Sequence, residues 1–314
     1  MPKVLGLFDA FTGLMLQTLC FPLYTHEQSK VWMLHPLLKA GELLVGDRAF
    51  CSFVHLAMLF SRGIHGLFRV HQKQIVDFRP HRKYRKSYQK GRKVSGKRGR
   101  AKPSRPMPRS KFIKRLGKHD QIVEWFKSAA GRPKWISDEQ WEALPQSLVL
   151  RELRFVLARK GQRTRVVTIA TTLLDPALYP KAKIAQLYGV RWQVETHFAE
   201  LKTTLKMRKL KSKTAEGVKK ELTVYALVYN LVHQVMCKAA GAQNVSPDRI
   251  SFIDALRWIL SAGTDEQVPE LIVNPRRPDR HEPRVVKDRQ DTYTKMTRPR
   301  HVLRKELKKQ GVEA

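Results

Sequence analysis

Four side chains between residues 179 and 208 carry groups that could do chemistry: Tyr188, Arg191, Glu195 and Lys202. At about 100° per residue, these positions fall within roughly 60° of one another around a helix. The row combines one carboxylate with three side chains that donate hydrogen bonds, which suits an anionic ligand. The alternative is a core helix with ordinary ion pairs three or four residues apart, because most charged helix residues are solvated.

The same segment carries an apolar stripe beside this row. Helical periodicity places its six members within roughly 80° of one another; they are Leu187, Val190, Val194, Phe198, Leu201 and Leu205. Because the segment has few helix breakers, we predict one continuous helix. Its apolar stripe would pack on a sheet, and its margin would present the row.

A second acid follows a short apolar run. Residues 42–46 (ELLVG) have the length and composition of a buried strand, and Asp47 comes directly after them. Ligand groups commonly sit at the carboxyl ends of strands in α/β sheets. Alternatively, Asp47 caps the helix predicted over residues 52–60, where aspartate is a common capping residue.

The spacing of the row, with two, three and six residues between its members, resembles the Tyr-Arg-Glu-Lys signature of DDE-type transposases of the insertion sequence four family. Three runs around it resemble the same family: TTLLDP at 171–176, LYGVRW at 187–192 and ELK at 200–202. GDRAF at 46–50 resembles the motif of that family's second catalytic aspartate. The resemblance covers nearly the whole chain, and it implies an α/β, RNase H-like fold with a β-rich insertion.

The resemblance also implies a reaction, namely metal-dependent cleavage and strand transfer of insertion-sequence DNA. Asp47 and Glu195 would be catalytic and would hold divalent cations, with Mg²⁺ preferred and Mn²⁺ as a substitute. Tyr188, Arg191 and Lys202 would bind the phosphates beside the reacting one. The partners would be transposon-end and target DNA, bound by a homodimer that brings two ends together.

One feature departs from the family. Its first catalytic aspartate lies on a strand upstream of the hairpin that we predict over residues 1–21, and Asp9 in LFDAFTG matches a non-catalytic position. We therefore expect this acid and its strand to be missing, in a truncated or decayed transposase or a downstream fragment of a split gene. Whether the chain is active alone stays open. The alternatives are a non-catalytic nucleic-acid-binding derivative and a structural RNA-binding protein.

Composition agrees with a nucleic-acid partner. The chain of 314 residues carries 61 Lys and Arg against 27 Asp and Glu, a net charge of +34, which favours binding to a polyanion. Its three cysteines have no CxxC spacing, so they indicate neither a zinc ribbon nor a disulfide framework. Without an apolar run of membrane-spanning length, we expect a cytoplasmic, nucleoid-associated bacterial protein with no membrane contact.

The pattern divides the chain into four parts. Residues 1–70 form the first part of the core, 71–173 an insertion, 174–262 the second part of the core, and 263–314 a basic tail. Within the insertion, residues 79–118 lack Asp and Glu and predict a disordered basic loop that grips the DNA backbone, while 148–157 and 165–172 predict strands.

Four more side chains invite a functional interpretation. Trp125, Trp135 and Trp141 could stack on a flipped base, although a tryptophan in this setting is more often part of the core. His233 lies in a helix predicted over residues 221–237, and we interpret it as a structural or exposed side chain rather than a ligand.

Overall fold

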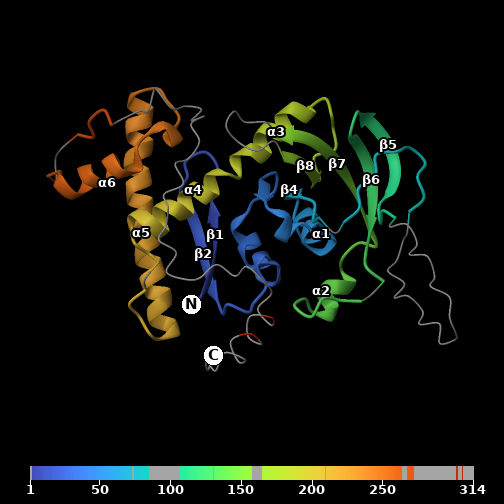
Figure 1. Ribbon diagram of the computed structural model, residues 1–314, viewed down its shortest axis with the longest axis horizontal. Coiled ribbons are helices and arrows are strands. Elements are labelled where there is room, and N and C mark those ends of the chain that lie inside the picture. The colour runs from blue at the N-terminus through green and yellow to red at the C-terminus, as the bar shows by residue number, and fades with distance from the viewer. Residues whose placement is uncertain are drawn as a thin grey trace.

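The computed structural model describes residues 2–72, 74–84, 107–129, 131–157, 165–208, 210–263, 267–271, 302 and 306. Figure 1 shows the large sheet on one side and the long helix α5 on the other, with the hairpin β1–β2 between them. Residues 85–106 of the predicted basic loop lie outside the described residues, as does nearly all of the tail.

The six-stranded sheet has the order β3-β4-β8-β7-β6-β5. Its strands are β3 Leu43–Gly46, β4 His65–Arg69, β5 Lys111–Gly117, β6 Asp120–Phe126, β7 Ser147–Leu157 and β8 Arg165–Thr171. β3 pairs with β4 in parallel, and every other neighbouring pair in the sheet is antiparallel. The strands predicted at 42–46, 148–157 and 165–172 are therefore confirmed.

The pairing of β4 with β8 joins the predicted insertion to the predicted core. Leu67 of β4 lies opposite Thr171 of β8, so the two parts share one hydrogen-bonded sheet. The division into four parts stays a prediction, but the proposed boundary runs through a continuous sheet. The prediction of a disordered loop over 79–118 is wrong at its end, because residues 111–117 form β5 against β6.

The parallel strands β3 and β4 are connected through α1, Phe53–Phe60. The hydroxyl of Ser52 caps this helix by accepting a hydrogen bond from the backbone N–H of His55. Leu56 and Leu59 are fully buried beneath the helix. The helix predicted over 52–60 is confirmed, and Asp47 does not cap it. Asp47 instead precedes a 3₁₀ turn, Arg48–Phe50, without a capping hydrogen bond.

The hairpin predicted over residues 1–21 is confirmed. β1, Lys3–Phe8, pairs with β2, Met15–Phe21, as a separate antiparallel sheet. Asp9 holds the turn, since its Oδ1 accepts hydrogen bonds from the backbone N–H groups of Phe11 and Thr12 and from the Thr12 hydroxyl. Asp9 thus has a structural role.

The prediction of one continuous helix over 179–208 is wrong. The segment forms α3, Lys181–Val190, then α4, Gln193–Ala199, then a π-helical turn, Glu200–Thr204. At the break, the N–H groups of Arg191 and Trp192 bond to carbonyls only three residues back. The break allows one apolar stripe to serve two cores: Leu187 packs beside the sheet, whereas Phe198 and Leu201 pack with α5.

The second core centres on α5, Ala215–Ala242, with α6, Phe252–Ser261, packed against it. α5 extends the helix predicted over residues 221–237 at both ends. α5 also fixes the hairpin, because the side-chain amide of Asn230 exchanges two hydrogen bonds with the backbone of Met15. The hydroxyl of Tyr229 donates to the carbonyl of Gly13 at 2.9 Å.

The remaining short elements are α2, Asp138–Glu142, and three 3₁₀ turns, Glu27–Ser29, Val31–Leu37 and Pro247–Arg249. Near α2 the core interpretation of the tryptophans is confirmed for Trp125 and Trp141, which are buried, while Trp135 is partly buried beside Trp141. The indole of Trp125 donates to the buried carboxylate of Glu152 at 2.9 Å.

Candidate functional site

Asp47 lies at the carboxyl end of β3, next to the carboxyl end of the parallel strand β4. Its Oδ1 is buried and has no hydrogen-bond partner. An unpaired buried acceptor costs about 1–3 kcal/mol, and more when it is charged. A carboxylate oxygen that is buried without a hydrogen-bond partner is suited to binding a cation.

Tyr188 lies deep against the sheet rather than on an exposed margin. Its side chain is 2% exposed and packs edge-on against Phe155 of β7. Burial raises the pKa of Tyr188 to about 12, and the charge of Asp47 adds to this shift while Arg191 and Arg69 oppose it. The phenol of Tyr188 therefore lies within electrostatic reach of both Asp47 and Arg191.

Arg191 sits at the break between α3 and α4 and reaches the second predicted acid. Its Nη2 lies 3.2 Å from Oε1 of Glu195, and its guanidinium stacks over the ring of Trp192 at 4.4 Å. The Glu195 side chain is 57% exposed, whereas that of Arg191 is 14% exposed. The carboxylate of this pair is therefore accessible to another cation.

The structure connects three of the four members of the row. Tyr188, Arg191 and Glu195 are linked by successive contacts, and the charge of Asp47 lies within electrostatic reach of Tyr188. Lys202 lies in the π-helical turn, exposed, with its ammonium 5.1 Å from the ring centre of Phe198. Among the described residues, neither Asp47 nor Glu195 belongs to a group of three ligand side chains.

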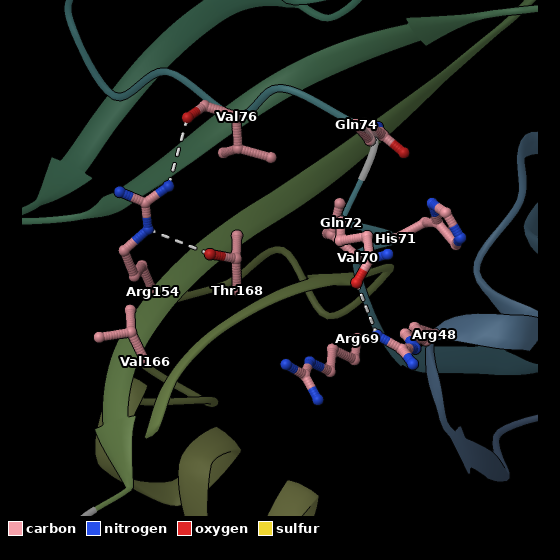
Figure 2. A pocket seen from close by; sticks show the side chains of 10 residues that line it. All are labelled: Arg48, Arg69, Val70, His71, Gln72, Gln74, Val76, Arg154, Val166 and Thr168. Atoms are coloured by element: carbon pink, nitrogen blue, oxygen red, sulfur yellow. Dashed lines mark hydrogen bonds between the residues drawn. The ribbon is translucent and has the colours of Figure 1, made fainter. Parts of the chain in front are cut away.

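A cationic pocket of about 220 Å³ is lined by Arg48, the residue that follows Asp47. Figure 2 shows Arg48, Arg69 and Arg154 around it, from the turn after β3, the end of β4 and the middle of β7. Arg154 is held by hydrogen bonds to the Thr168 hydroxyl and the Val76 carbonyl. Arg69 and Arg154 were not predicted from the sequence, because they come together only through the pairing of β8 with β4 on one side and β7 on the other.

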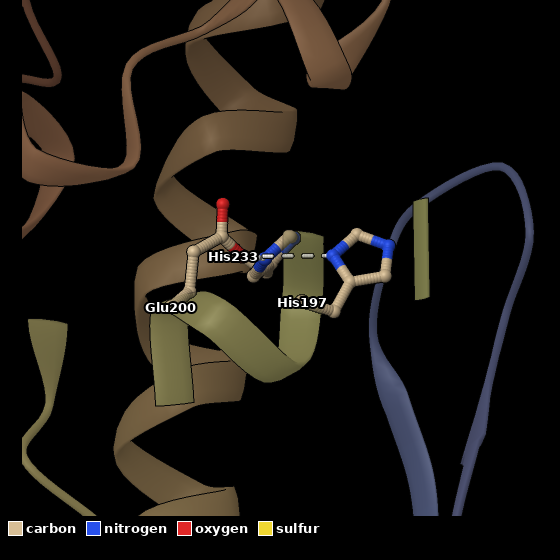
Figure 3. Close-up of side chains that lie close together, drawn as sticks. All are labelled: His197, Glu200 and His233. Atoms are coloured by element: carbon tan, nitrogen blue, oxygen red, sulfur yellow. Dashed lines mark hydrogen bonds and ion pairs between the residues drawn. The ribbon is translucent and has the colours of Figure 1, made fainter. Parts of the chain in front are cut away.

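A second group of side chains, which was not predicted from the sequence, lies where α4 meets α5. His197, Glu200 and His233 converge between α4, the π-helical turn and α5 (Figure 3). His233 is 2% exposed, so it is a buried member of this group. The spacing of His197 and Glu200 on a helix was visible in the sequence, but no local pattern relates them to His233.

Residues 2–231 match the family model described as the transposase DDE domain, so the chain belongs to the family that this domain defines. The chain is also 30% identical over 200 residues to the transposase InsG for insertion sequence element IS4 from Escherichia coli (strain K12). The resemblance to insertion sequence four transposases is confirmed. The match spans 58% of this chain and 43% of that relative, so the chain covers less than half of its length.

The mixed α/β architecture with a multi-stranded sheet is consistent with this family. In the part of the chain that the structure describes, no helix has both the length and the apolar character needed to span a membrane.

Proposed function

We propose that this chain takes part in metal-dependent cleavage and strand transfer of insertion-sequence DNA, with an RNase H-like core and with Asp47 and Glu195 as metal ligands. The observation that carries the proposal is the buried, unpartnered carboxylate oxygen of Asp47. It lies at a strand end, within electrostatic reach of the phenol of the family signature.

The donor set suits a hard divalent cation. Carboxylate oxygens are the ligands that Mg²⁺ and Mn²⁺ prefer. When bound, such a cation supplies Lewis-acid stabilisation of the phosphoryl oxygens and a more acidic attacking hydroxyl. Asp47 offers an oxygen without another partner, and Glu195 offers one held only by an exposed ion pair.

The cationic side chains position the DNA. Arg48, Arg69 and Arg154 line a pocket next to the turn that follows Asp47, and this pocket matches the oxygens of a phosphate group. Arg191 neutralises Glu195 in the absence of DNA and turns to a phosphate when DNA binds, which frees the carboxylate. Lys202 adds a point charge further along the same segment. The net charge of +34 supplies the remaining, sequence-independent attraction.

The partners follow from the reaction. Transposon-end DNA and target DNA are the substrates, and joining two ends calls for two copies of the chain in one complex. A homodimer in a synaptic complex, working at the bacterial nucleoid in the cytoplasm, is the assembly that we propose.

Nicking of transposon-end DNA in Mg²⁺, by this chain and by Glu195→Ala, tests the catalytic assignment. The full chain should nick the DNA and the variant should not, while both should bind it equally at fixed salt. Equal nicking by the two proteins would remove Glu195 from the site. Lys220→Ala, in an exposed ion pair on α5, is the matched control and should nick normally.

A second candidate function is non-catalytic binding of nucleic acid. It is favoured by one observation, that no third ligand side chain joins Asp47 and Glu195 among the described residues. In that case the chain binds end DNA with steep salt dependence, and neither Mg²⁺ nor Mn²⁺ produces nicks. A preference for RNA over DNA of the same length would instead indicate a structural RNA-binding protein.

A further inference from the structure

Three ligand atoms, two from neighbouring turns at His197 and Glu200 and one from His233 of α5, meet in the core beside α5. Oε2 of Glu200 lies 3.5 Å from Nδ1 of His197 and 3.4 Å from Nε2 of His233, and all three atoms lie within 4.8 Å of one another. Figure 3 shows the carboxylate of Glu200 and the two imidazole rings turned toward a common point. None of these residues has a role in the reaction proposed above.

These distances are long for hydrogen bonds but fit a shared metal ion. A charge-assisted N–H···O bond is about 2.7–2.9 Å long. Ligand atoms at about 2.1 Å from a tetrahedral Zn²⁺ lie about 3.4 Å apart. In addition, Nδ1 of His197 is buried without a hydrogen-bond partner, in a residue that is 8% exposed. A buried acceptor aimed at the other two ligand atoms is explained by a cation between them.

A hydrogen bond at Nδ1 orients the ring of His233 so that Nε2 can act as a metal ligand. Its Nδ1 lies 3.2 Å from the backbone carbonyl of Thr12. A proton on Nδ1 that is donated to this carbonyl leaves the lone pair of Nε2 facing Glu200. Metal-binding histidines commonly have this arrangement, because the outer hydrogen bond fixes the tautomer and the orientation of the ring.

An aromatic shell encloses the group. Phe8 stacks on His197 with ring centres 5.2 Å apart, and Tyr229 lies 4.3 Å from His233. Burial raises the pKa of Glu200, but the two histidines outweigh this effect, so that its pKa lies below the ordinary value and the carboxylate is ionised. Low polarity around two imidazole rings and one carboxylate strengthens their bonds to a cation.

There is room for a fourth ligand. A small cavity of about 20 Å³ adjoins the group and is lined by both histidines, Gln193 and Asp248 among others. A water molecule needs about 10–15 Å³ and polar partners. Two histidines, one glutamate and one water form a set that zinc enzymes use.

We propose that His197, Glu200 and His233 bind one transition-metal ion, with Zn²⁺ as the best-fitting species. The ion would tie α4, the π-helical turn and α5 together, and its ligand His197 is two residues from Glu195. Imidazole ligands select such ions over Mg²⁺, so this site is separate from the carboxylate site and does not depend on the proposed reaction.

The test uses the untagged full chain, stripped with EDTA and titrated with Co²⁺ as a spectroscopic substitute for Zn²⁺. One equivalent of Co²⁺ should give the visible absorption of a tetrahedral site, without the charge-transfer band of a thiolate ligand. One equivalent of Zn²⁺ should displace it, and Mg²⁺ in large excess should not. Absence of stoichiometric Co²⁺ binding by the unmodified chain would overturn the proposal. A proton shared between Glu200 and a histidine would then account for the arrangement.

Variants locate the metal. Glu200→Gln and His233→Asn should lower Co²⁺ affinity at least about tenfold, since removing even an outer hydrogen bond costs 10–100-fold. The matched control is His119→Asn, an exposed histidine at φ 57°, where asparagine is well tolerated. Asp47→Ala should keep the Co²⁺ spectrum and lose nicking, which separates the two sites. Retention of the spectrum in both Glu200→Gln and His233→Asn, with circular dichroism showing folded protein, would also overturn the proposal.

Discussion

Asp47 and Asp9 are two acids that follow strands, and their surroundings give them opposite roles. Asp9 accepts three hydrogen bonds within its turn, whereas Oδ1 of Asp47 is buried and accepts none. A carboxylate that satisfies its neighbours stabilises the fold. A carboxylate that is buried without hydrogen bonds lowers the free energy of unfolding. Proteins tolerate this loss of stability where function requires it.

Replacing Asp47 by alanine should therefore raise the free energy of unfolding by about 1 kcal/mol, because the unpaired buried acceptor is removed. The same change should abolish nicking. Urea denaturation measures the first effect and the DNA assay the second. Asp9→Ala is the control and should lower the free energy of unfolding, since it leaves the turn N–H groups without their acceptor. A less stable Asp47→Ala protein would contradict this account.

Sequence alone predicted Asp47 and Glu195 as candidates, because each lies in a local motif. It did not predict Arg69, Arg154 or His233, which reach their sites through strand pairing or helix packing. Such residues carry no signal in their own neighbourhood. They become recognisable only when the register of the strands and the contact between helices are known.

At the scale of elements, a buried ion pair joins the strands β6 and β7. Arg151 donates to both oxygens of Asp120 at 2.8 and 2.6 Å, and to the carbonyl of Tyr179 before α3. Both side chains are almost fully buried. The pair therefore links the sheet to the segment that positions Tyr188.

Replacing Arg151 by methionine should lower the free energy of unfolding by about 3–5 kcal/mol, because it leaves a buried carboxylate unpaired. The double variant with Asp120→Leu should recover most of the loss. Urea denaturation of the four proteins in this cycle measures the coupling. Equal stabilities for the Arg151→Met single variant and the double variant would contradict the argument.

Periodicity predicted the elements that fold by local rules, including the hairpin over 1–21 and the helix after Ser52. It failed at residues 191 and 192, because the apolar period continues through a break whose cause is packing on two cores. It also failed for β5, since a charged run becomes a strand when β6 offers its edge for pairing. In both cases tertiary contacts override the local preference.

At the scale of the whole molecule, charge would set the affinity for the proposed DNA substrate. A net charge of +34 predicts binding that weakens steeply with salt. The pocket lined by Arg48, Arg69 and Arg154 concentrates part of this charge next to the turn that follows Asp47. The two arginines on β4 and β7 should therefore each contribute to this salt dependence.

Arg69→Gln and Arg154→Gln should each weaken binding of end DNA and reduce the slope of log affinity against log salt by about 1. Fluorescence anisotropy between 50 and 200 mM salt measures this slope, over roughly the range in which phosphate contacts lose most affinity. The control is Arg132→Gln, whose guanidinium is already paired with Asp138 on the surface. An unchanged slope in both pocket variants would show that the phosphate lies elsewhere.

The π-helical turn at Glu200–Thr204 closes with a hydrogen bond from the N–H of Leu205 to the carbonyl of Glu200, five residues apart. Such a turn holds one residue more than the α-helical path would need. Deleting a single residue here would let the same N–H and carbonyl close an ordinary α-helical turn, with the flanking residues kept in place. Chain length can therefore change by one residue at this point without moving Leu205 from the α5 core, and a single deletion should be better tolerated here than within α5.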